Sequence, residues 1–226
     1  MGNGDRILVI AAHPDDEVLG CGATLALAAD AGASVHVAFL ADGVFSRTDG
    51  EQLELQRRRE AARKACAIIG VRTIDFGDYP DNRMDTVPLL DITKSIETLI
   101  DHYQPDTLYT HHAGDVNIDH RQIHQATIPA CRPQSNHPVR TLLFFEVASS
   151  TEWQPPGSGT AFQPNWFVDI SSALDRKLAA LNAYVEEMRD WPHPRSFRGI
   201  EALARWRGAT IGTEAAEAFV LGRCLR

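Results

Sequence analysis

Apolar runs alternate with helix-like segments along most of the chain. Short apolar runs bounded by turn residues are typical of buried strands, and they occur at 6–12, 34–41, 72–76, 106–110 and 140–147. Stretches with helical character lie between them, near 17–31, 51–69, 88–103 and 119–130. Gly32 and Gly70 each stand just before a strand, where a glycine commonly ends a helix. This alternation predicts an α/β fold with a mostly parallel sheet and helices on both faces.

The pattern changes after residue 148. Residues 151–164 are rich in proline and glycine and have no periodicity, so we expect a loop there. The elements expected after it are a strand at 166–170, a helix capped by Ser171 or Ser172 and running through Val185, a helix near 200–207 and a strand near 218–221. We therefore expect a single domain over 1–226, with a core at 1–147 and a C-terminal elaboration of it at 148–226.

Composition limits the classes of function. A chain of 226 residues with 44% hydrophobic content is long enough for one domain with a substantial core. Its formal charge of −8 argues against nucleic acid as a partner, because phosphate binding needs a basic face. No apolar run approaches the roughly 20 residues that span a bilayer, and no signal peptide is visible. The four widely spaced cysteines indicate reduced thiols and a cytoplasmic protein, with Cys21 and Cys66 in the core.

The first candidate for chemistry follows the first apolar run directly. Residues 11–17 read Ala-Ala-His-Pro-Asp-Asp-Glu, and Pro14 breaks the strand before the next helix. This order places His13, Asp15 and Asp16 at the carboxyl end of a strand, where open α/β sheets bind ligands. His13 and Asp16 can face one cation from such a turn, while the neighbouring carboxylate stays free.

The second candidate is a histidine-rich segment at residues 110–124, which holds His111, His112, His120 and His124. It follows the fourth predicted strand, so it falls on the same edge of the sheet as His13. Two imidazoles and one carboxylate with an open fourth position are typical of catalytic zinc. The sequence therefore predicts a Zn²⁺ site made of His13, Asp16 and a histidine of this segment.

Simpler explanations exist for each feature. Acidic residues are favoured in the first turn of a helix by its dipole, and a lone histidine at a strand end is often structural. His120 and His124 have the spacing of one polar face of an exposed helix. The coincidence of both segments at strand ends of one sheet argues against all these explanations together.

These residues resemble the LmbE-like, PIG-L-type zinc-dependent N-acetylglucosaminyl deacetylases. Residues 12–17 match the first signature of that family, and Asp119-His120 match the end of the second, usually His-Pro-Asp-His. Weaker matches follow in the family's order at Asp42-Gly43, Arg57-x-x-Glu60, Pro80-Asp81 and Phe145-Glu146. The resemblance covers roughly residues 6 to 147. It implies a Rossmann-like fold and hydrolysis of the N-acetyl group of a small-molecule aminosugar conjugate.

The resemblance also implies roles for individual residues. It assigns the zinc ligands to His13, Asp16 and His120, and the general base to Asp15. The division of the two aspartates is chemically reasonable, because one must coordinate while the other takes a proton from water. Arg57 and Asp81 are implied as substrate contacts. His124 stays a rival for the third zinc position, because it shares a helical face with His120.

One departure from the family concerns the proton donor. Asn117 stands where the family usually has a histidine, three residues before the second zinc histidine. An asparagine donates a hydrogen bond to an oxyanion but supplies no proton. Asp15 acting twice, or His124, His111 or His112, would then protonate the leaving amine.

Three further residues are expected to contact the substrate. Asp42 closes the second strand at the functional edge, although a plain turn has the same sequence. Glu146 closes an apolar strand, where a lone carboxylate needs a partner. His112 lies in the histidine-rich segment.

Two other functions compete with this prediction. A zinc amidase acting on a non-sugar acyl amide needs the same metal site and differs only in the pocket. A nucleotide-binding module is favoured by Gly20-x-Gly22 and Asp42, which loosely match a dinucleotide fingerprint. Leu25 replaces its third glycine, and the acidic turn at 15–17 would repel a pyrophosphate. The sequence leaves the aglycone open, and it is compatible with a homo-oligomer.

Overall fold

The computed structural model describes residues 4–42 and 52–225. Its strands are β1 (Arg6–Ala11), β2 (Ser34–Ala41), β3 (Thr73–Tyr79), β4 (Thr107–His111), β5 (Thr141–Phe145), β6 (Trp166–Asp169) and β7 (Ala216–Cys224). Its helices are α1 (Asp16–Asp30), α2 (Gln52–Ile69), α3 (Leu89–Tyr103), α4 (Ile118–Ala130), α5 (Leu174–Leu181) and α6 (Phe197–Ala209). Short 3₁₀ turns are η1 (Met84–Thr86), η2 (Thr151–Trp153) and η3 (Asn182–Tyr184).

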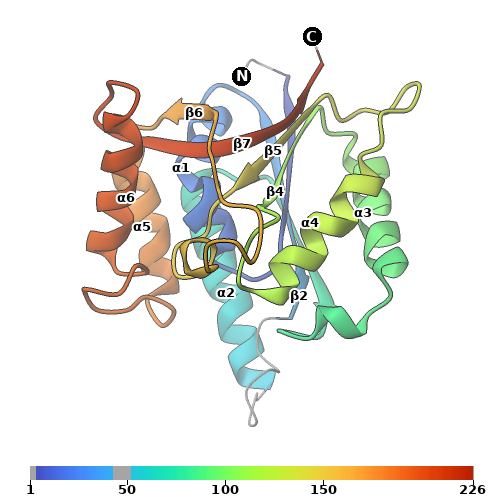
Figure 1. The fold of residues 1–226 in the computed structure, drawn as a ribbon, viewed down its shortest axis with the longest axis horizontal. Helices are drawn as coiled ribbons and strands as arrows, with labels where there is room; N and C mark the ends of the chain where they lie inside the picture. The colour runs from blue at the N-terminus through green and yellow to red at the C-terminus, as the bar shows by residue number, and fades with distance from the viewer. Residues whose placement is uncertain (1–3, 43–51, 226) are drawn as a thin grey trace.

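Within the described residues, the strands form one sheet of seven in the order β3-β2-β1-β4-β5-β7-β6 (Figure 1). Strands β1 to β5 are mutually parallel, and β7 runs antiparallel between β5 and β6. The predicted mostly parallel α/β sheet is therefore confirmed.

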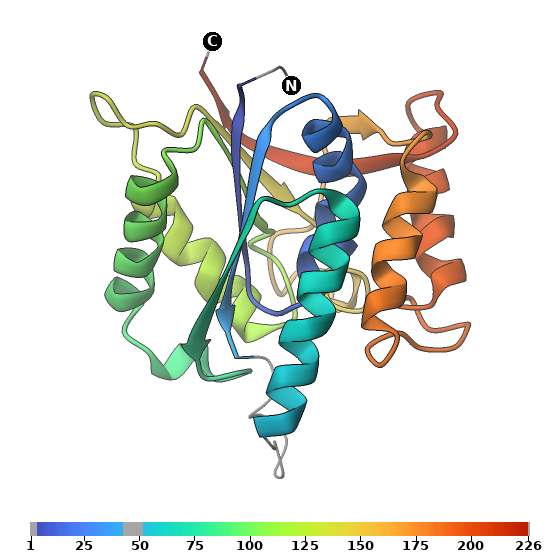
Figure 2. The same cartoon turned by 180° about the vertical axis from the view of Figure 1, so that it is seen from behind.

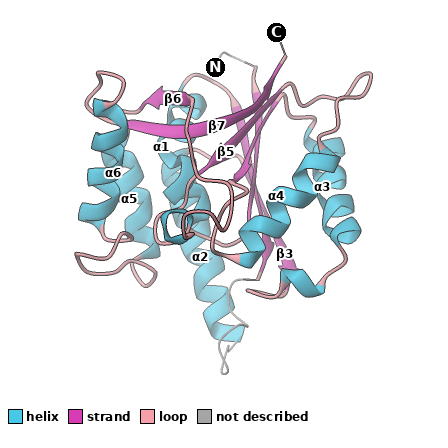
Figure 3. Cartoon of the chain, in the orientation of Figure 1, coloured by secondary structure: helices cyan, strands magenta, loops and turns pink. Residues whose placement is uncertain are grey.

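Helices cover both faces of the sheet, as predicted (Figures 2 and 3). Successive residues of β1 point to opposite faces: Ile7 and Val9 pack in the cluster that includes residues of α1, α2 and α5, whereas Leu8 and Ile10 pack against α3 and α4. Strands buried on both faces read as continuous apolar runs, which explains the run at 7–10. Cys21 and Cys66 are fully buried, which confirms their prediction as core residues.

Most predicted elements are present, with shifted ends. Gly32 and Gly70 have φ values of +89° and +91°, a conformation that glycine adopts without strain, and they end α1 and α2. The predicted serine cap of α5 is wrong: the residue before this helix is Ala173, because the hydroxyl of Ser171 donates to Asp169 instead. The helix also ends at Leu181 and continues as η3. Gly43 and Glu51 lie outside the described residues.

The chain order creates a crevice at the centre of the sheet. After β1 the chain proceeds outward through β2 and β3, and it then returns to place β4 on the other side of β1. Ligands bind outside the carboxyl ends of strands at such a topological switch point. The two candidate segments follow β1 and β4, so the fold brings them to this point.

The C-terminal part extends the same sheet with β6 and β7, and α5 and α6 pack beside α1 and α2 (Figure 3). Gly20 and Gly22 lie inside α1, where a Cβ on Gly20 would overlap the ring of Phe145. They serve close packing of a helix and do not form a phosphate-binding turn. No helix in the described part of the chain is long and apolar enough to cross a membrane.

Candidate active site

The turn after β1 holds its carboxylates in fixed positions. The backbone N–H of His13 donates to Asp16 Oδ2 at 2.8 Å, and that of Asp15 donates to Glu17 Oε2 at 3.0 Å. Asp15 has φ of +121°, a conformation that costs about 1–3 kcal/mol for a residue with a side chain. The hydrogen bond from Asp15 to Glu17 therefore stabilises a strained turn.

Glu17 is held in turn by the C-terminal part of the chain. Its side chain is fully buried, and its Oε1 accepts a hydrogen bond of 2.7 Å from the hydroxyl of Tyr184. Burial raises the pKa of Glu17 to about 8, although the Tyr184 bond opposes the rise. A chain of contacts thus runs from η3 through Glu17 to the backbone of Asp15.

Asn117 fixes the second segment at the start of α4. Its Oδ1 accepts from the backbone N–H groups of Asp119 at 2.8 Å and His120 at 3.4 Å, which makes it the helix cap. The cap orients the first turn of α4, and His120 Nε2 lies 3.3 Å from Asp16 Oδ2. The predicted convergence of the two segments is therefore present in the structure.

His13, Asp16 and His120 form a candidate metal group, with one ligand atom of each within 4.8 Å of the others. His13 turns Nε2 to Asp119 Oδ2 at 3.0 Å and Nδ1 towards Asp16 Oδ2 at 3.4 Å. His120 turns Nδ1 to Asp115 Oδ1 at 3.2 Å and Nε2 towards the same Asp16 oxygen. Each imidazole is thus oriented by an outer carboxylate, as metal-ligating histidines usually are.

A metal ion fits this group because one imidazole nitrogen, Nε2 of His120, lacks a hydrogen-bond partner in the described structure. This nitrogen is buried and faces a carboxylate. A second group of His13, Asp81 and Asp119 also satisfies the distance criterion. The Asp119 oxygens there already accept backbone N–H groups of Asn82 at 2.6 Å and Met84 at 3.0 Å. The first group therefore fits better as the ligand set, and Asp119 as its support.

The pKa values of the site are set by burial and by carboxylates that face the imidazoles of His13, His111 and His120. Burial alone would lower the pKa of His120, but Asp16 and Asp115 outweigh it and raise that pKa to about 9. Burial would likewise raise the pKa of Asp16, and the facing histidines His120 and His111 hold it well below its ordinary value. For His13, the opposing burial is outweighed by hydrogen bonds to carboxylates, led by Asp119, which raise its pKa well above the usual value. A cation is thus favoured at this position.

Asp15 faces a fixed cation instead. Its Oδ2 accepts a hydrogen bond of 3.0 Å from Arg195 Nη1, and Arg195 Nε donates to the hydroxyl of Ser149 at 3.1 Å. Burial raises the pKa of Asp15 to about 6, and Arg195 limits the rise. Asp15 is therefore a carboxylate beside the ligand group but outside it, as a general base requires.

These groups open into a cavity of about 430 Å³. The predicted residues that line it are His13, Asp15, Asp16, Asp81, Asn117 and His120. Asp81 also contacts the metal group, since its Oδ1 lies 3.0 Å from His13 Nε2. Trp153 of η2 is 51% exposed at this cavity and is held edge-on against His193.

The structure places two other predicted residues away from this cavity. Glu146 forms a two-fold ion pair with Arg207 at 2.7 and 2.8 Å, so its expected partner is an arginine of α6. His112 lies under the loop 151–164, where its Nε2 donates to the carbonyl of Thr160 at 2.9 Å.

Three further predicted residues also lie outside this cavity. His124 Nδ1 donates to the carbonyl of His111 at 2.9 Å, and His124 belongs to neither candidate metal group. Asp42 and Arg57 are not among the lining residues, and Arg57 borders a neighbouring cavity.

Several residues of the site escaped sequence reasoning. Arg58, next to the predicted Arg57, lines the cavity beside the candidate metal group. Ser150 and Thr151 donate to Asp115, which orients His120. Three arginines precede Glu60 in α2, and the sequence does not indicate which of them faces the site. The spacing Asp115-x-Asn117 is typical of a turn that caps a helix. It could have indicated that Asp115 lies just before the start of α4, close to His120.

Comparison with known proteins identifies the family. The family model of GlcNAc-PI de-N-acetylases (PIG-L) matches residues 8–131. The chain belongs to this family. It is 31% identical to the uncharacterized deacetylase YaiS of Escherichia coli (strain K12), over 79% of this chain and 89% of that protein. It is 30% identical to the diacetylchitobiose deacetylase of Thermococcus kodakarensis, over 79% of this chain and 68% of that protein.

The family relationship extends to another reaction and to solved structures. The chain is 28% identical to 4-oxalmesaconate hydratase of Pseudomonas putida, over 86% of this chain and 80% of that protein. The conserved protein TT1542 of Thermus thermophilus has the same fold, with a TM-score of 0.78 and 25% identity, over 97% of this chain and 96% of that one. The fold predicted from the resemblance is confirmed.

Proposed function

We propose that this protein hydrolyses the N-acetyl group of an N-acetylglucosamine-type conjugate, with Zn²⁺ held by His13, Asp16 and His120. The observation that carries the proposal is the ligand group itself, with the bare Nε2 of His120 aimed at the Asp16 carboxylate. When bound, zinc polarises a carbonyl oxygen and lowers the pKa of water to about 7. Its preference for two imidazoles and a carboxylate matches the donor set.

Asp15 is the general base of the proposed reaction. It lies next to the ligand group yet is paired with Arg195, so its carboxylate stays available to remove a proton from the attacking water. Arg195 keeps that carboxylate in place and opposes its protonation. The reaction adds water across the amide C–N bond, and it yields acetate and the free amine of the sugar.

Asn117 donates a hydrogen bond to the oxyanion. Its Oδ1 is committed to capping α4, and this fixes the amide so that its NH₂ group faces Asn82 Oδ1 at 3.0 Å. One N–H is used in that bond, and the second is free to donate into the cavity that Asn117 lines. Asn117, the cap of α4, would thus stabilise the oxyanion in place of the usual histidine.

Asp15 also returns the proton to the leaving amine. His112 and His124 donate to backbone carbonyls outside the cavity. His111 is fully buried, and its Nε2 accepts from the backbone N–H of Ala12. Asp15 gains a proton when water attacks. The other buried acids of the cavity are Asp16, a proposed metal ligand, and Asp81, which contacts the proposed ligand His13. We therefore assign both proton transfers to Asp15.

The test measures acetate release and metal content together, with N-acetylglucosamine conjugates as substrates. Asp15→Asn is expected to retain zinc and to lower turnover by about 10²- to 10⁴-fold, whereas His120→Ala is expected to lose both zinc and turnover. Normal turnover in Asp15→Asn contradicts the base assignment. The deacetylase proposal is wrong if the protein releases acetate from no N-acetyl amide. If it then adds water to an unsaturated acid, the protein is a hydratase.

A further inference from the structure

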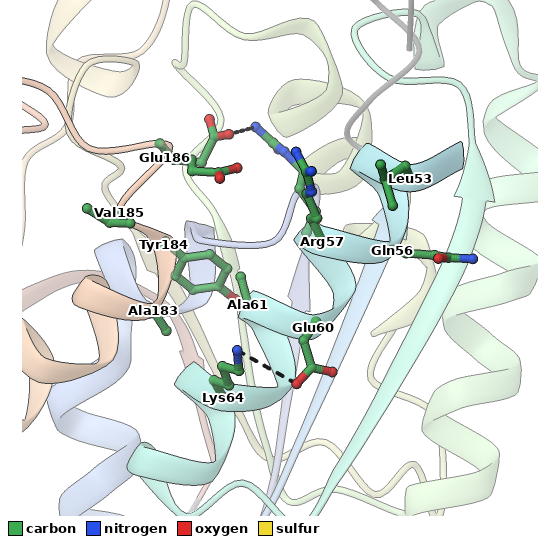
Figure 4. A pocket seen from close by; sticks show the side chains of 12 residues that line it. Leu53, Gln56, Arg57, Glu60, Ala61, Lys64, Ala183, Tyr184, Val185 and Glu186 are labelled. Carbon is green, nitrogen blue, oxygen red and sulfur yellow. Dashed lines mark ion pairs between the residues drawn. The ribbon is translucent and has the colours of Figure 1, made fainter. Parts of the chain in front are cut away.

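A second cavity lies against the catalytic one. It has a volume of about 490 Å³ and lies between α2 and the segment 183–187, which includes the end of η3 (Figure 4). Arg58 and Glu187 line both cavities, and they form an ion pair whose side chains are 13% and 12% exposed. The two cavities therefore share a wall that this ion pair forms.

The lining of the second cavity combines apolar side chains with charged ones. Its apolar residues are Leu53, Ala61, Ala183, Tyr184 and Val185. Leu53 and Val185 are 51% and 59% exposed, so apolar surface is left open to a ligand. Figure 4 shows Leu53 and Ala61 approaching from α2 and Val185 from the opposite side.

The charges of this cavity balance. Its cations are Arg57, Arg58 and Lys64, and its acids are Glu60, Glu186 and Glu187. Lys64 pairs with Glu60 at 3.9 Å, and Arg58 pairs with Glu187. Arg57 and Glu186 form no ion pair within the described residues, so one donor group and one acceptor group remain for a ligand. A balanced lining favours a neutral ligand over an anion.

We propose that this cavity binds a neutral sugar ring attached to the N-acetylglucosamine unit, so that the preferred substrate is a disaccharide or longer. This inference rests on the proposed function, and it names the class of aglycone. A sugar ring offers an apolar C–H face to Leu53, Ala61 and Val185, and hydroxyls to Arg57 and Glu186. Apolar surface with a few polar groups that fix orientation is the usual makeup of a small-molecule site.

The placement also connects the aglycone to the catalytic base. Tyr184 lines the second cavity, and its hydroxyl donates to Glu17, which accepts the backbone N–H of Asp15. A sugar in the cavity therefore lies beside the buried residue whose hydroxyl supports the turn of Asp15. Arg57, which the sequence resemblance implies as a substrate contact, would bind the sugar in this second cavity.

The experiment compares acetate release from N-acetylglucosamine, N,N′-diacetylchitobiose and N-acetylglucosamine 1-phosphate. For each enzyme the measured quantity is the ratio of kcat/KM for the disaccharide to that for the monosaccharide. Ala61 is half-buried at the cavity, so Ala61→Trp fills it, and the ratio is expected to fall by about tenfold or more. The matched control Ala67→Trp, at an exposed position of α2 that does not line the cavity, should keep the ratio.

A second variant, Arg57→Gln, tests the cavity in case Ala61→Trp does not fold. Arg57 is exposed, so its replacement leaves the packing of α2 intact. A smaller fall in the same ratio is expected for it. An unchanged ratio in both Ala61→Trp and Arg57→Gln, or a preference for the 1-phosphate over the disaccharide, overturns the sugar subsite and leaves the deacetylase intact. Failure of the zinc-loaded wild type to release acetate from any of the three overturns the deacetylase, and the subsite with it.

Discussion

Two groups of buried charged side chains contact helix α1, and they differ in how completely their hydrogen bonds are satisfied. Lys177 of α5 and Glu217 of β7 form an ion pair of 2.6 Å, and each side chain is 4% exposed. Lys177 also donates to the carbonyl of Leu19, and Glu217 accepts the backbone N–H groups of Ala23 and Thr24. This pair ties α1, α5 and β7 together and leaves no polar atom of either side chain without a partner.

The candidate metal group at the start of α1 is different. The carboxylates of Asp16, Asp81, Asp115 and Asp119 surround the imidazoles of His13 and His120, and His120 Nε2 has no hydrogen-bond partner in the described structure. A buried polar atom without a partner costs free energy unless something else binds it. The satisfied pair therefore fits a structural role, and the unsatisfied group fits the proposed metal site. The contrast separates two buried polar clusters that have similar residue types.

The largest expected effect concerns the structural pair. Lys177→Met leaves Glu217 buried without its cation, so the free energy of unfolding is expected to fall by about 3–5 kcal/mol in urea titration. Arg176→Met is the matched control on the same helix, since the Arg176–Asp30 pair is at the surface and its loss should change little. The double variant Lys177→Met/Glu217→Leu should recover much of the loss. An unchanged free energy of unfolding in Lys177→Met would show that the Lys177–Glu217 pair does not stabilise the fold.

The next effect concerns the orientation of His120, a proposed metal ligand. Asp115→Asn removes the carboxylate that holds His120 Nδ1, so the zinc dissociation constant is expected to rise by about 10- to 100-fold, with the fold retained. Competition with a chromogenic chelator measures it. Asp85→Asn on η1 is the control, because Asp85 is exposed and lies in neither metal group. Unchanged zinc affinity in Asp115→Asn would contradict the assignment of His120 Nε2 as a ligand.

The smallest effect tests the contact between Tyr184 and Glu17. Tyr184→Phe removes the hydroxyl that donates to Glu17, so kcat is expected to fall several-fold while KM and zinc content stay, because the turn of Asp15 loses support. The cost in unfolding free energy is about 1 kcal/mol. Tyr79→Phe is the control, since the Tyr79 hydroxyl bonds Ser95 away from the site. Equal kcat values in the two variants would show that the Tyr184 hydroxyl serves stability alone.

Much of the fold follows from local pattern. Strand β2 and the ends of α1 and α2 at Gly32 and Gly70 agree with prediction, because apolar runs and helix-ending glycines are local signals. The cap of α5 does not, because Ser171 had a competing acceptor in Asp169. Glu146 illustrates a long-range partner: its need for one is visible in the sequence, but its pairing with Arg207, 61 residues away, is not.

The sequence alone determined the element order, the two segments at strand ends and the residue types of a metal site. Only the tertiary structure decided which atoms meet. His120 and His124 are one helical turn apart, and a turn shifts a side chain by about 5.4 Å along the axis. That distance separates an imidazole facing Asp16 from one that donates to a backbone carbonyl. Side-chain identity is local, whereas partner choice depends on how distant elements pack, and so the carboxylates behind each histidine emerged only from the fold.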